Sequence, residues 1–360
     1  MVINTNEPQD DSRVALVIGA NGIVGSNMLR HLSEHTSWKL FGLARGAISP
    51  TSGATAISTD LLNKELSQEA LNKIGPVDYL FFTALAVRQT PEEQVEPNMA
   101  MLRNAVMPLL DPSKKLRHIS LVHGTKWYGS HLGPYKTPAQ ESDPRHIGPN
   151  FYYDQHDWLS EAQRHHQTWN FSTLRPHFIN GFNVGNPNNM MAAIGAYAAV
   201  QKAEGRPFNF PGTQAAYETL TMVSDVSLVN AAMMWAATNP QCANQDFNIH
   251  NGEYFRWKNI WPLLAEVFDM PCGDVVPTKL SEYMVSRAVT WNRIVIEHGL
   301  KPIAIEQIVS WTWADFFFRG EWDDMSSVLK ARNFGFNQFL DTQEDLIAGI
   351  ERYRIEKVLP

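Results

Sequence analysis

The sequence predicts an α/β fold, a doubly wound parallel sheet covered by helices, with a smaller and mostly helical lobe. Through about residue 250, short apolar runs rich in strand-forming residues alternate with longer segments of helical pattern. The apolar runs are continuous, which indicates strands that are buried on both faces of a parallel sheet. After about residue 250 the chain becomes helical and rich in aromatic residues.

Seven strands and six helices follow from this rhythm, and they alternate along the chain. The first strand run is "VALVIGA" and the fourth is "VDYLFFTA". The expected strands are 14–20, 39–45, 54–60, 77–84, 116–123, 170–174 and 245–250, and the expected helices lie near 24–35, 63–74, 91–109, 152–167, 190–204 and 224–237.

The helical lobe is expected to be apolar. Its segments read "FRWKNIWPLLAEVF", "WTWADFFF" and "FGFNQFL". Any single aromatic residue among them is best interpreted as core filling. Together they indicate an apolar lobe, and a cleft beside it would suit a lipophilic small molecule.

Composition and charge exclude several classes of partner. The 360 residues carry 30 basic and 37 acidic side chains, a net charge of −7, with no basic stripe for nucleic acid and no polybasic membrane anchor. No apolar run reaches the roughly 18 residues of a membrane span, and the polar start "MVINTNEPQDDSR" does not read as a signal peptide. Cys242 and Cys272 form no metal-binding spacing. We expect a reduced, cytoplasmic protein with no metal, nucleic-acid or membrane partner.

A glycine-rich turn directly after the first strand indicates a dinucleotide site. Glycines spaced as G-x-x-G-x-x-G at the start of a helix let the backbone turn tightly and approach a pyrophosphate. A tight turn that binds nothing is the alternative. The residues expected to contact the cofactor here are Gly19, Asn21, Gly22, Ile23, Val24 and Gly25.

The end of the second strand favours NADP(H) over NAD. The segment "LARGA" places Arg45 where NAD-binding proteins carry an acid, and a guanidinium pairs well with a 2′-phosphate. Arg45 as a solvated surface charge is the alternative. Asp60 and Leu61, after the third strand, are expected to flank the adenine, although Asp60 is equally placed to cap the next helix.

The chain lacks the usual lysine of a tyrosine-dependent reductase. Such enzymes often carry Tyr-x-x-x-Lys on one helix face, but "FYYDQHDW" places His156 and Asp157 after its tyrosines. Tyr254–Lys258 has the spacing but lies in the helical lobe, so we interpret it as chance. Lys126, in "LVHGTKWYG", is the candidate replacement because it follows the fifth strand, at the edge where ligands bind such sheets.

At this point the sequence resembles the progesterone 5β-reductase/iridoid synthase-like enzymes, an atypical branch of the extended short-chain dehydrogenases/reductases. The resemblance covers nearly the whole chain and implies a Rossmann fold. It rests on "VALVIGANGIVG", "LARG", "LRHISLVHGTKWYG", "NFYYDQHDWL", "LRPHFINGF", "FNIHNGEYFRWKNIWPLLAEVF" and "YRIEKVLP". We therefore expect 1–182 to form the dinucleotide-binding domain, completed by about 215–250, and 183–214 with 251–360 to form the substrate-binding lobe.

The resemblance implies a catalytic pair. Lys126 stands in its GTK-type motif and Tyr152 is the first tyrosine of its NFYY motif. Enzymes of this kind transfer hydride from NADPH to the β-carbon of an enone or enal, and an enolate develops at the carbonyl oxygen. Tyr152 is then the donor to that oxygen, and Lys126 supports the tyrosine and the ribose.

Further positions are expected along the cofactor. The segment after the fourth strand would follow the pyrophosphate and ribose, the fifth strand would line the site, and the backbone after Arg175-Pro176 would face the carboxamide. Each is equally compatible with a structural role. These residues are Thr83, Ala84, Leu85 and Ala86, then Ser120 and Val122, then His177, Phe178 and Ile179.

Four residues are expected at the substrate pocket, and three of them depart from the plant members. Those members carry Trp at Leu85, Phe at Tyr135 and Glu at His156, whereas Tyr153 is a packing neighbour of the catalytic tyrosine. They also carry a second arginine at Gly46 and lack three residues before 133–135. These departures leave the substrate open, and the 128–137 loop is closer to that of microbial members.

The sequence therefore predicts an NADPH-dependent oxidoreductase that reduces the C=C bond of a lipophilic enone or enal. Three alternatives stay open: a carbonyl reductase, a redox-neutral isomerase or cyclase, and a non-catalytic NADP(H)-binding protein. Members of the family are often dimers, so a homodimer is also compatible with the resemblance.

Overall fold

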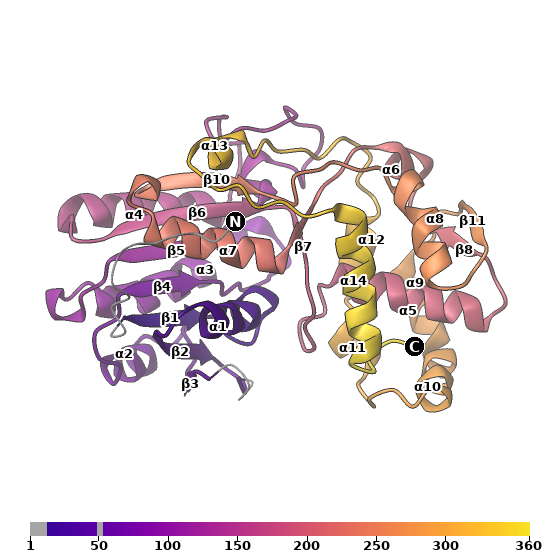
Figure 1. The fold of residues 1–360 in the computed structure, drawn as a ribbon, viewed down its shortest axis with the longest axis horizontal. Coiled ribbons are helices and arrows are strands. Elements are labelled where there is room, and N and C mark those ends of the chain that lie inside the picture. Colours follow the sequence, from indigo (N-terminus) through magenta and orange to yellow (C-terminus); the bar gives the residue numbers. More distant parts are fainter. Residues whose placement is uncertain (1–12, 49–52) are drawn as a thin grey trace. The chain divides into compact units, whose positions relative to one another are not determined.

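A computed structural model describes residues 13–48 and 53–360, and within them it contains a seven-stranded sheet (Figure 1). The sheet has the order β10-β6-β5-β4-β1-β2-β3. Strand β1 pairs in parallel with β2 and β4, β2 with β3, and β4 with β5. The strands are β1 (Val14–Ile18), β2 (Lys39–Ala44), β3 (Thr55–Ser58), β4 (Tyr79–Phe82), β5 (His118–Val122), β6 (Asn170–Pro176) and β10 (Gln245–Ile249). All seven expected strands are confirmed.

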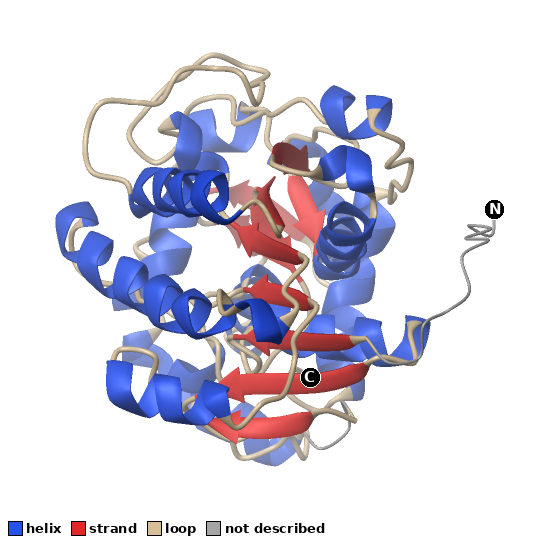
Figure 2. Ribbon diagram, turned by 90° about the vertical axis from the view of Figure 1, so that its left-hand side faces the viewer, coloured by secondary structure: helices blue, strands red, loops and turns tan. Residues whose placement is uncertain are grey.

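The six expected helices are also confirmed. Helices α2, α3 and α4 contact one another as one layer, whereas α1 contacts β1 and β2. Helices therefore cover both faces of the sheet (Figure 2), as a doubly wound fold requires. They are α1 (Ile23–His35), α2 (Lys64–Asn72), α3 (Pro91–Val106), α4 (Phe151–His166), α5 (Met190–Ala203) and α7 (Val226–Thr238).

Capping residues fix where two of these helices begin. At α3 the Thr90 hydroxyl accepts from the Glu93 amide, and the Glu93 carboxylate accepts from the Thr90 amide. At α4 the Asn150 side chain accepts from the Tyr152 amide at 3.1 Å. Both arrangements satisfy N–H groups that have no partner inside the helix. The cap on α4 therefore places Tyr152 in the first turn of the helix.

By its internal contacts the chain divides into two compact units. Unit 1 comprises 1–121, 149–173 and 233–245, of which 1–12 and 49–52 lie outside the described residues, and unit 2 comprises 122–148, 174–232 and 246–360. Compactness does not identify a ligand-binding lobe, so the expected domain division stays a prediction. The core of unit 1 is formed by strand residues of the sheet and by apolar faces of α3 and α4.

The core of unit 2 is rich in aromatic side chains. Trp261 stacks on Phe208 with ring centroids 4.3 Å apart, and its indole N–H donates to the Phe208 carbonyl at 2.9 Å. Most aromatic residues of the first two segments thus fill a core, as expected, whereas Phe316 and Phe339 are exposed. The helices here are α6 (Gln214–Glu218), α8 (Trp257–Val267), α9 (Leu280–Tyr283), α10 (Ala288–Glu297), α11 (Ile305–Ile308), α12 (Trp311–Phe317), α13 (Leu329–Asn333) and α14 (Thr342–Ile355).

Two short strand pairs were not predicted from the sequence. Strand β7 (Phe178–Asn180) pairs with β9 (Val223–Asp225), and β8 (Phe208–Phe210) pairs with β11 (Cys272–Val275). Each strand has three or four residues, too few to show a periodicity. Within 13–48 and 53–360, no helix combines the length and the hydropathy that crossing a membrane requires.

A half-buried carboxyl pair, Asp225 and Asp345, ties α14 to β7 and β9. The Asp345 carboxyl accepts from the Asn180 amide group at 2.7 Å and from the Asn251 amide group at 2.8 Å, and it also interacts with Asp225. Burial, and then the Asp225 carboxylate, raise the pKa of Asp345 to about 7. A shared proton therefore stabilises this junction.

We predict that this junction makes stability fall as the pH rises. The folded-state pKa of Asp345 is above its unfolded value, so its contribution is full below about pH 4 and is lost as the pH rises through about 7. Asp345→Asn should remove up to about 1.4 kcal/mol per pH unit from the slope of unfolding free energy between those values. Urea unfolding at several pH values measures that slope.

The matched control is Glu344→Gln, which removes an exposed carboxylate from the same helix turn. It should keep the wild-type slope. An Asp345→Asn slope equal to that of the wild type would show that the shared proton contributes nothing.

Candidate active site

The glycine turn is packed too tightly for larger residues. Gly19 has φ +80°, which favours glycine, and a Cβ added at Gly25 would lie 2.2 Å from the Gly19 carbonyl oxygen. Gly22 is the N-cap of α1, and no side chain caps the helix there. The first-turn amides of α1 have no acceptor inside the helix. The turn therefore fits the pyrophosphate of a dinucleotide.

Arg45 and Asn21 lie at the same edge of unit 1. Arg45 is exposed directly after β2, and its carbonyl oxygen accepts from the Ser58 hydroxyl at 3.3 Å. A Cβ at Gly46 would lie 3.3 Å from the Asn21 side-chain nitrogen, so the absence of a side chain at Gly46 leaves room for Asn21. This edge holds an exposed guanidinium next to the glycine turn, which is an arrangement that suits a 2′-phosphate.

Asp60 does not cap α2. Its carboxylate accepts from the Leu62 amide at 3.0 Å, and Asn63 is the cap, because its side chain accepts from the Leu66 amide at 3.0 Å. The alternative interpretation of Asp60 as a helix cap is therefore wrong. The Leu61 side chain is buried in the core of unit 1, and its carbonyl oxygen accepts from the Asn104 amide group at 2.8 Å, so neither is available to a ligand.

A buried asparagine that sequence reasoning missed holds the segment after β4. Asn98 is fully buried on α3, and its amide group makes two hydrogen bonds of 2.9 Å to the backbone of Ala86. The Thr83 hydroxyl donates to the Ile18 carbonyl at 2.7 Å, so this hydroxyl is already used. Ala84 and Ala86 are half-buried and Leu85 is exposed. The only available signal was an asparagine on the apolar face of a helix.

Tyr152 remains a neutral phenol at physiological pH. Burial raises the pKa of Tyr152 well above its usual range. Its ring packs edge to face against Phe151, with centroids 4.5 Å apart. A protonated hydroxyl can donate a hydrogen bond to a developing oxyanion.

The two other helix residues expected at the site make contacts within unit 1. Tyr153 is buried, in line with the packing role expected of it. The His156 ring packs edge to face against Phe171 at 5.5 Å, and its Nδ1 lies 3.7 Å from the Asp157 carboxylate. The predicted substrate contact of His156 gains no support from these neighbours.

Lys126 stands in a short 3-10 helix, residues Thr125–Tyr128, directly after β5. Lys126 is exposed, yet the surrounding protein desolvates the ammonium group in part and lowers the pKa of Lys126. The ammonium nitrogen lies 5.9 Å from the centre of the Phe316 ring, on α12. In unit 2 this cation therefore lies beside an apolar wall.

Arg175 anchors the residues that follow Lys126. Its guanidinium has no exposed surface, and its Cζ lies 3.7 Å from the centre of the Trp127 ring. One nitrogen donates to the Tyr128 hydroxyl at 3.1 Å, and another lies 2.8 Å from the Asp246 carboxylate. Sequence reasoning placed Arg175 only at the end of a strand and missed this role.

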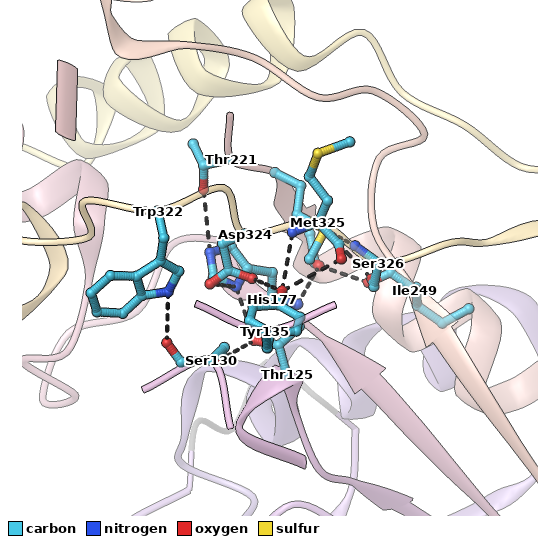
Figure 3. A network of polar contacts seen from close by, with 12 residues as sticks. Thr125, Ser130, Tyr135, His177, Thr221, Ile249, Trp322, Asp324, Met325 and Ser326 are labelled. Carbon is cyan, nitrogen blue, oxygen red and sulfur yellow. Dashed lines mark hydrogen bonds and ion pairs between the residues drawn. The ribbon is translucent and has the colours of Figure 1, made fainter. Parts of the chain in front are cut away.

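His177 lies at the centre of a polar network in unit 2 (Figure 3). Its Nδ1 lies 3.1 Å from the Thr125 hydroxyl and 3.5 Å from the Asp324 carboxylate, and its Nε2 lies 3.4 Å from the Thr221 hydroxyl. Burial lowers the pKa of His177, and Asp324 opposes that effect only in part. The imidazole is therefore mostly neutral at pH 7.

The backbone after Arg175-Pro176 is partly used within the protein. The His177 amide donates to the Ser224 hydroxyl at 3.0 Å, and Phe178 and Ile179 belong to β7, which pairs with β9. The His177 amide is thus not available to the nicotinamide carboxamide. Within the described residues, the buried Ser120 hydroxyl of β5 has no hydrogen-bonding partner.

The expected site residues divide between the two units. Unit 1 contains Gly19, Asn21, Gly22, Ile23, Val24, Gly25, Arg45, Asp60, Leu61, Thr83, Ala84, Leu85, Ala86, Ser120, Tyr152, Tyr153 and His156. Unit 2 contains Val122, Lys126, Tyr135, His177, Phe178 and Ile179. The cofactor-binding, catalytic and pocket roles given to these residues remain predictions.

Known proteins with similar sequences cover almost the whole chain. A (S)-8-oxocitronellyl enol synthase of Camptotheca acuminata is 33% identical over 370 aligned residues, covering 98% of this chain and 95% of that protein. A 3-oxo-Delta(4,5)-steroid 5-beta-reductase of Arabidopsis thaliana is 32% identical, covering 99% of this chain and 96% of that protein.

Solved structures with the same fold are more distant in sequence. A UDP-glucose 4-epimerase of Thermotoga maritima has a TM-score of 0.68 at 14% identity, covering 95% of this chain and 99% of its own. A UDP-glucose 4-epimerase of Thermus thermophilus has a TM-score of 0.67 at 15% identity, with the same coverage. At such identities the likeness shows the fold alone.

A family model described as a PRISE-like Rossmann-fold domain matches residues 52–360. This match spans most of the chain, and relatives above 30% identity cover nearly all of it. The chain therefore belongs to the PRISE-like Rossmann-fold family and is an oxidoreductase.

Proposed function

We propose that this protein uses NADPH to reduce the C=C bond of a lipophilic enone or enal. The observation that carries the proposal is the half-buried hydroxyl-bearing side chain of Tyr152 in the first turn of α4, in a chain that retains Lys126. The names of two relatives support it, since one is an enol synthase and the other a steroid 5-beta-reductase. An enol is the direct product when hydride adds to the β-carbon of an enal and the oxygen takes a proton.

The residues divide the work of such a reaction. NADPH, when bound, supplies a hydride to the β-carbon of the substrate. The electron pair of the C=C bond then moves toward the carbonyl oxygen, and the Tyr152 hydroxyl donates a hydrogen bond to that oxygen. Lys126 adds a positive charge, which favours the developing enolate. Solvent can later protonate the α-carbon, so no side chain has to deliver that proton.

Lys126 suits this role because of its surroundings in unit 2. Its ammonium is partly desolvated, and a cation in such surroundings interacts more strongly with a developing negative charge than it would in water. The Phe316 ring, about half exposed, offers apolar surface beside it. We therefore propose a substrate whose carbonyl is its polar end and whose remainder is hydrocarbon.

NADP(H) is proposed as the cofactor because of Arg45. This exposed guanidinium follows β2 next to the glycine turn, and unit 1 places no acid at that position. We also propose that the binding partner is a lipophilic small molecule. The enzyme is proposed to be cytoplasmic and to act as a monomer or a homodimer.

The first test is a substrate panel with purified protein and NADPH, read by absorbance and product mass together. The panel holds 2-cyclohexen-1-one, citral and a steroid enone. We expect NADPH consumption and a product two mass units heavier with its carbonyl intact. An allylic alcohol would identify a carbonyl reductase instead. Substrate conversion without net NADPH loss would favour the redox-neutral alternative. Binding of NADPH without turnover of any substrate would contradict both C=C reduction and carbonyl reduction.

Tyr152→Phe should separate catalysis from cofactor binding. Loss of one donor to an oxyanion lowers kcat by about 10²- to 10³-fold in comparable sites. We expect that loss in steady-state assays, with the NADPH dissociation constant unchanged by fluorescence titration. Tyr217→Phe is the matched control, because it removes the hydroxyl of another half-buried tyrosine that is not among the expected site residues. Full activity in Tyr152→Phe would overturn the catalytic assignment.

Arg45→Ala should weaken the preference for NADPH. Removal of a charge-assisted contact to a 2′-phosphate should raise the KM for NADPH about tenfold or more, and the KM for NADH should change little. Lys73→Ala serves as the control, since it removes an exposed cation of unit 1 that pairs with Glu69. Equal effects on NADPH and NADH would mean that Arg45 does not recognise the phosphate.

A further inference from the structure

Two segments of unit 2 that are distant in the sequence lie side by side. We call residues 129–139 the loop, because they follow the Lys126 turn, and residues 322–327 the strap. Hydrogen bonds join them along their length. These run from the Trp322 indole N–H to the Ser130 carbonyl at 3.2 Å, from the Ala139 amide to the Met325 carbonyl at 2.8 Å, and from the Ser327 amide to the Ala139 carbonyl at 2.8 Å.

Asp324 is the polar centre of this seam (Figure 3). One carboxylate oxygen accepts from the Tyr135 hydroxyl at 2.5 Å, and the other lies 3.5 Å from Nδ1 of His177. The Tyr135 hydroxyl in turn accepts from the Met325 amide at 3.0 Å. A single side chain therefore connects the strap, the loop and the residue that precedes β7.

The same network reaches the residue next to Lys126. The Thr125 hydroxyl lies 3.1 Å from Nδ1 of His177 and accepts from the Ser130 hydroxyl at 3.2 Å. Both ring nitrogens of His177 are engaged, because Nε2 lies 3.4 Å from the Thr221 hydroxyl. The His177 ring thus links the strap to the residue before Lys126 and is itself also held by Thr221.

The contacts of Asp324 are more than packing. Its side chain is about one-sixth exposed, so burial alone does not hold it in place. A hydrogen bond to a carboxylate is among the stronger ones in proteins. Its neighbour Asp323 is exposed and accepts from the Leu220 amide at 2.8 Å, and that contact involves neither the loop nor His177.

We propose that Asp324 is a positioning residue for the substrate. Through Tyr135 it holds the loop in one arrangement, whereas Arg175 separately anchors the turn that carries Lys126. Substrate binding then depends on Asp324, whereas cofactor binding does not. The inference rests on the proposed function, because it assigns the loop to the substrate.

The test compares Asp324→Ala, Asp324→Asn and the control Asp323→Ala. Asp324→Ala removes both contacts and should raise the KM for the enal or enone about tenfold or more, with kcat within about threefold and the NADPH dissociation constant unchanged. Asp324→Asn keeps an oxygen that accepts from Tyr135, so part of the effect should be rescued. Asp323→Ala should match the wild type in all three quantities.

A second readout needs no turnover. Hydrogen exchange at the amides of Ala139, Met325 and Ser327 should speed up in Asp324→Ala and stay at the wild-type rate in Asp323→Ala. Unchanged exchange together with unchanged KM would overturn the proposal. Equal losses in kcat, cofactor affinity and thermal stability would also overturn it, because they would indicate a merely structural role.

The two proposals fail in different ways. If the wild-type protein reduces no compound of the panel, the proposed function is wrong, and substrate positioning in that reaction falls with it. The exchange rates still decide whether Asp324 fixes the loop. If the wild type reduces a panel compound and Asp324→Ala has an unchanged KM, only the positioning role is lost.

Discussion

The buried guanidinium of Arg175 is the constraint on which the part of unit 2 around Lys126 depends. A charge with no exposed surface is tolerated only where partners compensate it, and here Trp127, Tyr128 and Asp246 do so. Two of these partners directly follow Lys126 in the chain. The Lys126 turn is therefore held in place by two residues that contact a buried cation, while Asp246 balances its charge. Arginine suits this position better than lysine, because its planar group stacks on an indole ring while it donates in the plane.

Most of the fold could be predicted from the sequence because its signals are local. A strand such as β1 is a continuous apolar run, and the glycines of the turn that follows it form a motif within seven residues, although a Cβ at Gly19 would also collide with Thr83 and Ala84. The alternative interpretation that Asp60 caps α2 is wrong, although capping is also a local signal. Asp60 and Asn63 both precede α2, and only the geometry shows which side chain accepts from an amide of the helix. Strands β7 and β9 form by pairing with each other, and neither is long enough to show the periodicity of a strand in the sequence.

The supporting parts of the candidate site could not be predicted, because they join residues that are distant in the sequence. Tyr135 and Asp324 are 189 positions apart, and the role of the carboxylate cannot be inferred until the folded chain brings the two residues together. The sequence singles out Tyr135 only because the plant members carry phenylalanine at that position. The structure gives that difference a physical reason: the additional hydroxyl both donates to Asp324 and accepts from Met325. The position of Lys126 after the fifth strand makes it a candidate, but its pairing with Tyr152 follows only from the resemblance, since spacing alone does not connect a loop lysine with a helix tyrosine.

The surroundings of Tyr152 also bear on which double bond the enzyme reduces. Burial alone raises the pKa of this tyrosine, so its hydroxyl keeps its proton at physiological pH. Reduction of a carbonyl group produces an alkoxide, a strong base that must take a proton as it forms. Addition of hydride to a conjugated C=C bond produces an enolate, a much weaker base that a hydrogen bond alone can stabilise. A tyrosine that donates without giving up its proton is sufficient for the second reaction, and that is why we place reduction of the C=C bond ahead of reduction of the carbonyl.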